Sequence, residues 1–192
     1  MENKYLIEVS ARHVHLTREA MDVLFGEGEE LEARAQLTQK GVFAAKQRVD
    51  VIGPKGTLKK MSILAPLRKY VQIEVSKTDA RALGVEPPVR ESGNVAGSPG
   101  CTLVGPKGTL EISQGVIVAK RHMHMNTATA EAMNIKDGDT IGIEVNDGER
   151  ALLFKDVVVR ISPYVNDFVH IDTDEGNAAG IVGHTYGSIV KL

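Results

Sequence analysis

Short runs of Val, Ile and Leu recur along most of the chain, and each is bounded by Gly, Pro or Asp residues that favour turns. Such runs are typical of β-strands. The predicted strands are Tyr5–Ser10, Gln47–Ile52, Thr57–Leu64, Val71–Val75, Gly115–Ala119, Thr140–Val145, Leu152–Ile161 and Phe168–Ile171. Many short strands with few helices favour barrels or sandwiches over a doubly wound sheet.

Four short segments have helical patterns. In the first, Thr17–Phe25, Thr17 is a suitable N-cap, and Ala20, Leu24 and Phe25 fall on one face. The other three are Lys77–Leu83, Thr127–Met133 and Thr173–Gly180. The predicted fold class is therefore mainly β with short helices.

An internal repeat divides the chain. The segment Arg12–Leu16, with the sequence Arg-His-Val-His-Leu, recurs 109 positions later as Arg121–Met125, Arg-His-Met-His-Met. A second series, from Leu64–Pro66 to Gly84, recurs from Ile161–Pro163 to Gly180 at an offset of 96 to 97. The difference between the offsets predicts an insertion of about a dozen residues in the first copy.

We expect two related small β-barrel domains from this duplication. The predicted ranges are 1–90 for the first domain, 91–109 for a linker and hairpin region, and 110–192 for the second domain. A third repeat, Ile52–Leu58 and Val104–Leu110, is out of phase with the others. Its Gly-Pro-Lys-Gly core indicates a hairpin turn that is used twice.

The repeat also carries the chemistry. Residues i and i+2 of a strand point to the same face, so each His-x-His pair presents two imidazoles to one point. A metal ion needs at least a third ligand. The duplication nominates Glu74 and His170, which occupy equivalent places. The two predicted sets are His13, His15 and Glu74, and His122, His124 and His170. These ligands suit zinc or another imidazole-favouring metal such as cobalt or iron.

Several of the candidate residues also have a purely structural interpretation. A lone His-x-His in a strand is more often structural or exposed than a metal site; it is the duplication that favours metal. His184 has no partner in the repeat and is expected to be an ordinary surface or interface residue. Cys101 is expected to be a structural thiol because no helix N-terminus or base accompanies it. Arg68 is either a surface ion-pairing residue or a guanidinium that holds phosphate or carboxylate.

Composition narrows the classes of protein. The 192 residues carry 23 Lys and Arg against 25 Asp and Glu, a net charge of −2, so nucleic-acid or membrane-surface binding is not indicated. The single Cys excludes an internal disulfide and favours a reducing compartment. Apolar runs are too short for a membrane span, and the N-terminus lacks the apolar core of a signal peptide.

The sequence resembles the propanediol-utilisation type phosphotransacylases, also called phosphate propanoyltransferases or the PduL family. The resemblance covers nearly the whole chain. It is carried by Ser10–His15, Gly53–Gly56, Leu64–Arg68, Gln72–Asp79, Pro88–Gly93, Gly115–Met125 and His170–Gly180. It implies two β-barrel domains, two metal ions, normally zinc, and reversible conversion of acyl-CoA and phosphate to acyl phosphate and CoA. The acyl groups it implies are acetyl and propanoyl.

The resemblance assigns roles to single residues. It implies the same two metal-binding sets and Arg68 as the residue that holds phosphate. Ser10, Leu64 and Asn177 would lie near coenzyme A. Arg81 stands where some members have an aromatic residue near the adenine, so guanidinium stacking would replace an aromatic stack.

The chemistry implied is direct attack of phosphate on the thioester at a two-metal site, without an acyl-enzyme. A zinc-dependent acyl-CoA thioesterase and a non-catalytic metal- or CoA-binding module remain the alternatives. The expected partners are acyl-CoA, phosphate and acyl phosphate, and the resemblance makes a homodimer plausible. The expected location is the cytoplasm, because the chain begins only a few residues before its first strand and shows no microcompartment-targeting extension.

Overall fold

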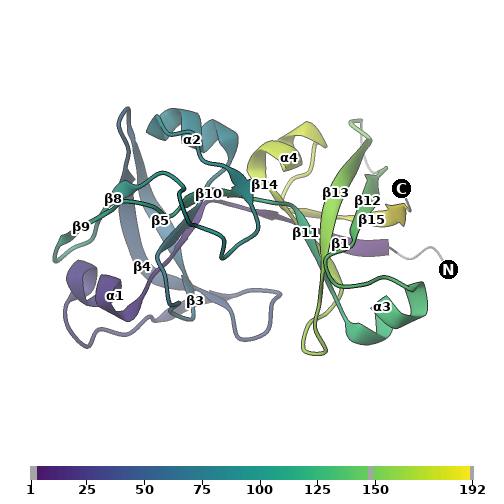
Figure 1. The fold of residues 1–192 in the computed structure, drawn as a ribbon, viewed down its shortest axis with the longest axis horizontal. Coiled ribbons are helices and arrows are strands. Elements are labelled where there is room, and N and C mark those ends of the chain that lie inside the picture. The colour runs from purple at the N-terminus through teal and green to yellow at the C-terminus, as the bar shows by residue number, and fades with distance from the viewer. Residues whose placement is uncertain (1–3, 147–148, 191–192) are drawn as a thin grey trace. The chain divides into compact units, whose positions relative to one another are not determined.

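The computed structural model describes residues 4–146 and 149–190 and divides into two compact units (Figure 1). The closed-barrel unit contains the described residues up to Ala11 and from Lys120 onward, and the open-sheet unit contains Arg12–Ala119. The division differs from the predicted ranges in three places. The first strand joins the C-terminal segment. Residues 91–109 lie within the open-sheet unit instead of between two domains, and residues 110–119 belong to that unit instead of to the second domain.

The closed-barrel unit is built around a barrel of six strands among the described residues, in the order β1-β14-β11-β13-β12-β15. Its elements are β1 (Lys4–Ser10), β11 (His122–Met125), α3 (Thr127–Met133), β12 (Thr140–Val145), β13 (Leu152–Ile161), β14 (Phe168–Asp172), α4 (Thr173–Ala178) and β15 (His184–Val190). Alternate strand residues such as Ile7, Met123 and Val169 are fully buried and fill its core. Antiparallel pairing of β15 with both β1 and β12 closes the barrel.

The open-sheet unit has nine strands within the described ranges, in the order β7-β10-β6-β2-β5-β4-β8-β9, with β3 paired to β4. Its elements are β2 (His13–His15), α1 (Arg18–Phe25), β3 (Ala33–Gln36), β4 (Phe43–Ile52), β5 (Thr57–Ala65), β6 (Gln72–Glu74), α2 (Lys77–Leu83), β7 (Val89–Arg90), β8 (Cys101–Val104), β9 (Thr109–Ile112) and β10 (Val116–Ala119). This sheet curls but does not close, because β8 leads outward to β9 instead of back to β10.

The predicted fold class, mainly β with short helices, is confirmed. One sheet is a closed barrel, whereas its counterpart is a curled half-barrel. The predicted helices are present, with Thr17, Ser76, Asn126 and Asp172 as their N-caps. The strands that the hydrophobic pattern missed include β3, β8, β9 and β15, which are short, exposed or interrupted by Gly.

The duplication is visible in backbone detail. His13 pairs with Ser62 across parallel strands β2 and β5, and His122 pairs with Val158 across parallel strands β11 and β13. Both β5 and β13 contain a bulge with a residue at positive φ, Lys60 (52°) and Asp156 (56°), and these are 96 positions apart. The offset is the one that relates Glu74 to His170.

The two copies exchange a strand. In the sequence, β1 precedes the first His pair and β10 precedes the second. In the structure, β1 runs parallel to β14, which carries His170, and β10 runs parallel to β6, which carries Glu74. Each unit is therefore completed by a strand from the other copy, which explains why the predicted domain range and the compact unit differ for residues 4–11.

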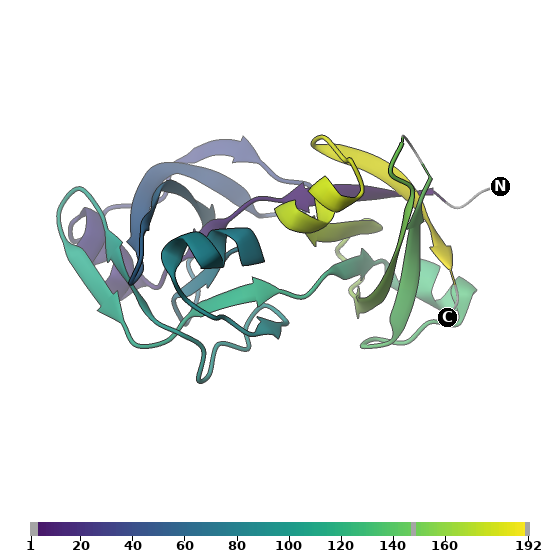
Figure 2. The ribbon, with the colours of Figure 1, turned by 90° about the horizontal axis from the view of Figure 1, so that it is seen from above.

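The repeated Gly-Pro-Lys-Gly segments form hairpin turns that pack against helix ends. Lys55 N–H donates to the carbonyl of Leu83 at the end of α2 (2.9 Å), and Lys107 N–H donates to that of Leu24 near the end of α1 (3.0 Å). A Cβ atom on Gly53 would lie 2.4 Å from the carbonyl oxygen of Leu83, so this approach requires glycine. Figure 2 shows α1 beside the β8–β9 hairpin.

Candidate metal centres

The first candidate centre, His13, His15 and Glu74, lies on strands β2 and β6 of the open-sheet unit. Glu74 is directly opposite His13 in the antiparallel pairing. Its carboxylate oxygens lie 3.4 Å from His13 Nε2 and 3.6 Å from His15 Nε2. Both histidines are almost fully buried. The strand alternation used in the prediction thus brings the three side chains together.

Electrostatics prepare these side chains to bind a cation. Burial lowers the pKa of His15 from 6.5 to about 4, and the charges of His13 and Arg68 act in the same direction. Burial alone would raise the pKa of Glu74, but charge and hydrogen bonds from His13 and His15 outweigh it and hold that pKa well below its usual range. At neutral pH, His15 therefore offers a lone pair and Glu74 a negative charge, which are the ligand forms.

A hydrogen-bond network connects Arg68 to this centre. The Ser92 hydroxyl donates to Glu74 Oε1 (3.0 Å) and accepts from Arg68 Nη1 (3.0 Å) and Gln72 Nε2 (2.8 Å). Gln72 Nε2 also donates to Glu74 Oε1 (2.6 Å), and its own oxygen accepts from Gly93 N–H (2.7 Å). One hydroxyl thus uses its one donor and both acceptor positions. The guanidinium is held one residue away from the candidate ligand.

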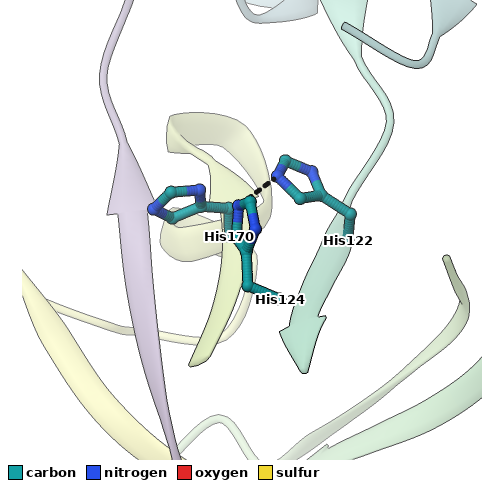
Figure 3. A group of neighbouring side chains, drawn as sticks. All are labelled: His122, His124 and His170. Carbon is teal, nitrogen blue, oxygen red and sulfur yellow. Dashed lines mark hydrogen bonds between the residues drawn. The ribbon is translucent and has the colours of Figure 1, made fainter. Parts of the chain in front are cut away.

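The second candidate centre, His122, His124 and His170, lies on strands β11 and β14 of the closed-barrel unit, with His170 opposite His122. Figure 3 shows the three rings turned toward one another. The Nε2 atoms of His122 and His124 are 3.2 Å apart, and the His124 ring stacks on Phe168 with centroids 4.6 Å apart. The duplicated pattern therefore produces a second convergent set.

The imidazoles of this centre are kept neutral. Burial lowers the pKa of His122 to about 3, assisted by the positive charge of Arg160. Burial lowers that of His124 to about 4, assisted by His170 and Arg160. His122 Nδ1 lies 2.9 Å from the carbonyl oxygen of Lys120, which can only accept, so Nδ1 carries the proton and Nε2 keeps the lone pair. Two uncharged nitrogens that face one another at short range suit a shared cation.

Both sets satisfy the requirements of a metal site. Within each, one ligand atom per residue lies within 4.8 Å of the others. The donors are two nitrogens and a carboxylate oxygen in the first and three nitrogens in the second, both of which suit zinc. His15 Nδ1 is buried without a hydrogen-bond partner in the described part of the chain. The residues present fit a divalent ion, for which each set would supply three protein ligands.

The remaining predicted residues lie in both units. Ser10 ends β1, two positions after Glu8, and Asn177 lies exposed on α4 of the same unit. Leu64 lies on β5 two positions after Ser62, the partner of His13, so it shares the face of the first centre. Arg81 is exposed on α2. Their roles toward coenzyme A stay predictions.

Sequence reasoning missed several side chains at these centres. Ser92, Gln72, Arg160 and Glu8 all interact with a candidate ligand. Gln72 could have been predicted from the sequence, because residues i and i+2 of a strand share a face and Gln72 precedes Glu74 by two positions. Ser92 lies in a loop, and Glu8 and Arg160 act through strand register, which the local pattern does not contain.

The fold therefore consists of two β units from a duplication, and each unit carries a convergent triad of candidate metal ligands. Comparison with known proteins agrees: residues 6–182 match the family described as phosphate propanoyltransferase. The chain belongs to the phosphate propanoyltransferase family, a family of acyltransferases. No described helix has the length and apolar character needed to cross a membrane.

Curated relatives carry the same description. The phosphate propanoyltransferase of Listeria monocytogenes is 46% identical over 100% of this chain and 89% of its own. That of Thermotoga maritima is 48% identical over 91% of this chain and 83% of its own. That of Salmonella typhimurium is 45% identical over 90% and 81%. The family match over residues 6–182 spans both candidate centres.

Proposed function

We propose that this chain transfers a short acyl group, propanoyl or acetyl, between coenzyme A and inorganic phosphate. The observation that carries the proposal is the guanidinium of Arg68, held through Ser92 next to a triad of candidate metal ligands. A hydrolase needs only water at such a centre. An enzyme that uses phosphate needs a binding group for an anion beside it, and Arg68 is suited to that.

In the proposed reaction a phosphate oxygen forms a bond to the thioester carbonyl carbon, the carbon–sulfur bond breaks, and coenzyme A leaves as the thiolate. Arg68 has five N–H donors, of which the bond to Ser92 uses one, so its fork can also bind phosphate oxygens. Divalent ions at the two triads would supply positive charge to the developing oxyanion and the thiolate. Holding both reactants together makes the attack effectively unimolecular.

The attack is direct, without an acylated side chain. The one cysteine, Cys101, is buried, and burial raises the pKa of its thiol to about 12, so it is protonated and a poor nucleophile at neutral pH. Acylation of Cys101 or any other side chain during turnover, detected by mass spectrometry of quenched protein, contradicts this part of the proposal.

The test is thiol release from propanoyl-CoA and acetyl-CoA by zinc-loaded protein, with and without phosphate, together with acyl phosphate measured as its hydroxamate. We expect release that requires phosphate and matches acyl phosphate one to one. Release without phosphate identifies a thioesterase. Absence of release from either substrate, with metal bound, indicates a binding module.

A further inference from the structure

Strand β1 places a carboxylate beside the second candidate centre. Glu8 is paired with His170 in the parallel β1–β14 ladder, and its Oε2 lies 3.3 Å from His170 Nε2. On the other side of β14, His170 is paired with His122. A row across three neighbouring strands therefore reads His122, His170, Glu8, with side chains on one face of the sheet.

The contact with Glu8 determines which nitrogen of His170 is protonated. A carboxylate can only accept, so Nε2 carries the proton in this contact and Nδ1 keeps the lone pair. The arrangement reverses that of His122, whose Nδ1 is held by the Lys120 carbonyl and whose Nε2 faces His124. In Figure 3 the ring of His170 lies between β1 and the other two histidines.

The other unit lacks this carboxylate at the equivalent position. There the parallel ladder pairs Glu74 with Ile117, which lies 109 positions after Glu8. The first centre holds its negative charge within the triad, as Glu74. The second triad consists of three imidazoles, and Arg160 adds positive charge close to it. A carboxylate beside His170 offsets that charge.

We propose that Glu8 is a positioning residue for the second metal ion: it holds His170 through Nε2–H so that Nδ1 is the ligand atom, and it supplies the negative charge that this triad lacks. The inference rests on the metal sites of the proposed function. Carboxylates that hold metal-ligating histidines in this way raise metal affinity by about 10- to 100-fold.

Two substitutions separate the hydrogen bond from the charge. Glu8→Gln keeps an acceptor for Nε2–H and loses the charge, whereas Glu8→Ile removes both and introduces the side chain of the equivalent position. Glu144→Gln, on β12 of the same unit, is the matched control. Zinc affinity is measured by chelator competition in a His13→Ala background, where the second centre is the one that binds. Circular dichroism checks the fold.

We expect Glu8→Ile to weaken zinc binding by about 10- to 100-fold, Glu8→Gln by less, and Glu144→Gln not to change it. Unchanged affinity in both Glu8 variants overturns the inference and leaves the proposed function intact. If the wild-type residues of the second centre bind no zinc, and His122→Ala changes nothing, the proposed two-metal function fails together with it.

A second readout reports the ligand atom directly. Long-range proton–nitrogen NMR spectra of the zinc-loaded protein distinguish a metal-bound Nδ1 from a metal-bound Nε2 in each histidine. We expect Nδ1 of His170 and Nε2 of His122 to be the bound atoms. Coordination by Nε2 of His170 in the wild-type protein overturns the assignment, because that nitrogen could not then donate to Glu8.

Discussion

The two candidate centres stand on the same framework but differ in their chemistry. In each, an arginine precedes the His pair and binds the third residue of the helix that follows the third ligand: Arg12 to Asp79 and Arg121 to Glu175, both at 2.6 Å. Both helices have capping boxes that include these carboxylates. The two copies therefore share these arginine–carboxylate ion pairs, whose arginines we call the arginine anchors. The third candidate ligand and its neighbours differ between the copies.

The divergence separates two kinds of environment. Around Glu74, the Ser92 network links the triad to Arg68, a group suited to an anionic substrate. Around His170, Glu8 lies within hydrogen-bond distance of the His170 ring, and the charge of Arg160 helps to lower the pKa of His122. The first centre therefore has a group suited to an anion beside it, whereas the second has a carboxylate and a guanidinium beside its imidazoles.

Removing one ligand from the second centre is expected to have the largest effect and is the strongest test of this comparison. We expect His122→Ala to reduce bound zinc from two ions to about one per chain and to lower kcat by about 10³-fold, because the charge that stabilises the oxyanion is lost. Metal content and thiol release are measured together. Tyr164→Ala, at an exposed residue of the same unit outside both triads, is the control. Retention of two ions in His122→Ala removes it from the ligands.

Substitution of Arg68 tests whether phosphate belongs to the first centre. Arg68→Ala should raise the KM for phosphate by about 10- to 100-fold, the effect of one or two charge-assisted hydrogen bonds, without changing metal content or the KM for acyl-CoA. Arg68→Lys should recover part of the loss because it restores the charge but not the fork. Unchanged phosphate kinetics contradict the role of Arg68.

Acid should affect the closed-barrel unit more than the open-sheet unit in metal-free protein. His122 and His124 have pKa values of about 3 and 4, below the ordinary 6.5, so the unfolded chain takes up protons first as pH falls. Their stabilising contribution is complete above pH 6.5 and is lost as pH falls toward 4 for His124 and toward 3 for His122. At pH 5 the loss is about 2 kcal/mol per imidazole.

Hydrogen exchange resolves this loss by strand. Between pH 7 and pH 5, after correction for intrinsic rates, protection should fall more for β11, which carries His122 and His124, and its partner β14 than for β2 and β6, where the pKa of His15 is lowered to about 4. An equal decrease in both units contradicts the expected difference. Zinc should reduce the decrease in both, since it requires the neutral imidazoles.

Ser92→Ala tests how the guanidinium is held. Loss of the hydroxyl leaves the phosphate fork of Arg68 less ordered, and we expect a rise of about tenfold in the KM for phosphate, the value of one charged hydrogen bond. Ser98→Ala is the matched control. Ser98 is buried in the same loop, donates to Val95 O (2.8 Å) and accepts from Gly115 N–H (2.9 Å), so its loss should lower stability and leave KM unchanged.

Features of the fold and of the candidate centres that depend on nearby or repeated residues could be predicted from the sequence. Features that depend on contacts between residues far apart in the chain could not. The helices and the two triads follow from local patterns and from the duplication, because strand alternation and equivalence between copies are contained in the residues themselves. The role of β1 does not, because its hydrophobic pattern is the same whichever strand it pairs with. Glu8 and His170 are 162 positions apart, and only the register of β1 on β14 makes them neighbours. The turn between β8 and β9 was predicted from the repeated Gly-Pro-Lys-Gly segment, but the two strands beside it are too short for the hydrophobic pattern to show.

The smallest effect concerns the two arginine anchors themselves. Arg12 is nearly half exposed and makes its ion pair with Asp79, so Arg12→Ala should cost well under 1 kcal/mol. Arg121 is less exposed, donates through Nε to the carbonyl of Lys155 (2.7 Å), and lies 5.8 Å from the centre of the Phe154 ring. Arg121→Ala should therefore cost about 1 kcal/mol, measured as the shift in the urea unfolding curve of metal-free protein. Equal costs would mean that the contacts to Lys155 and Phe154 add nothing, and that the duplicated ion pair alone anchors each helix.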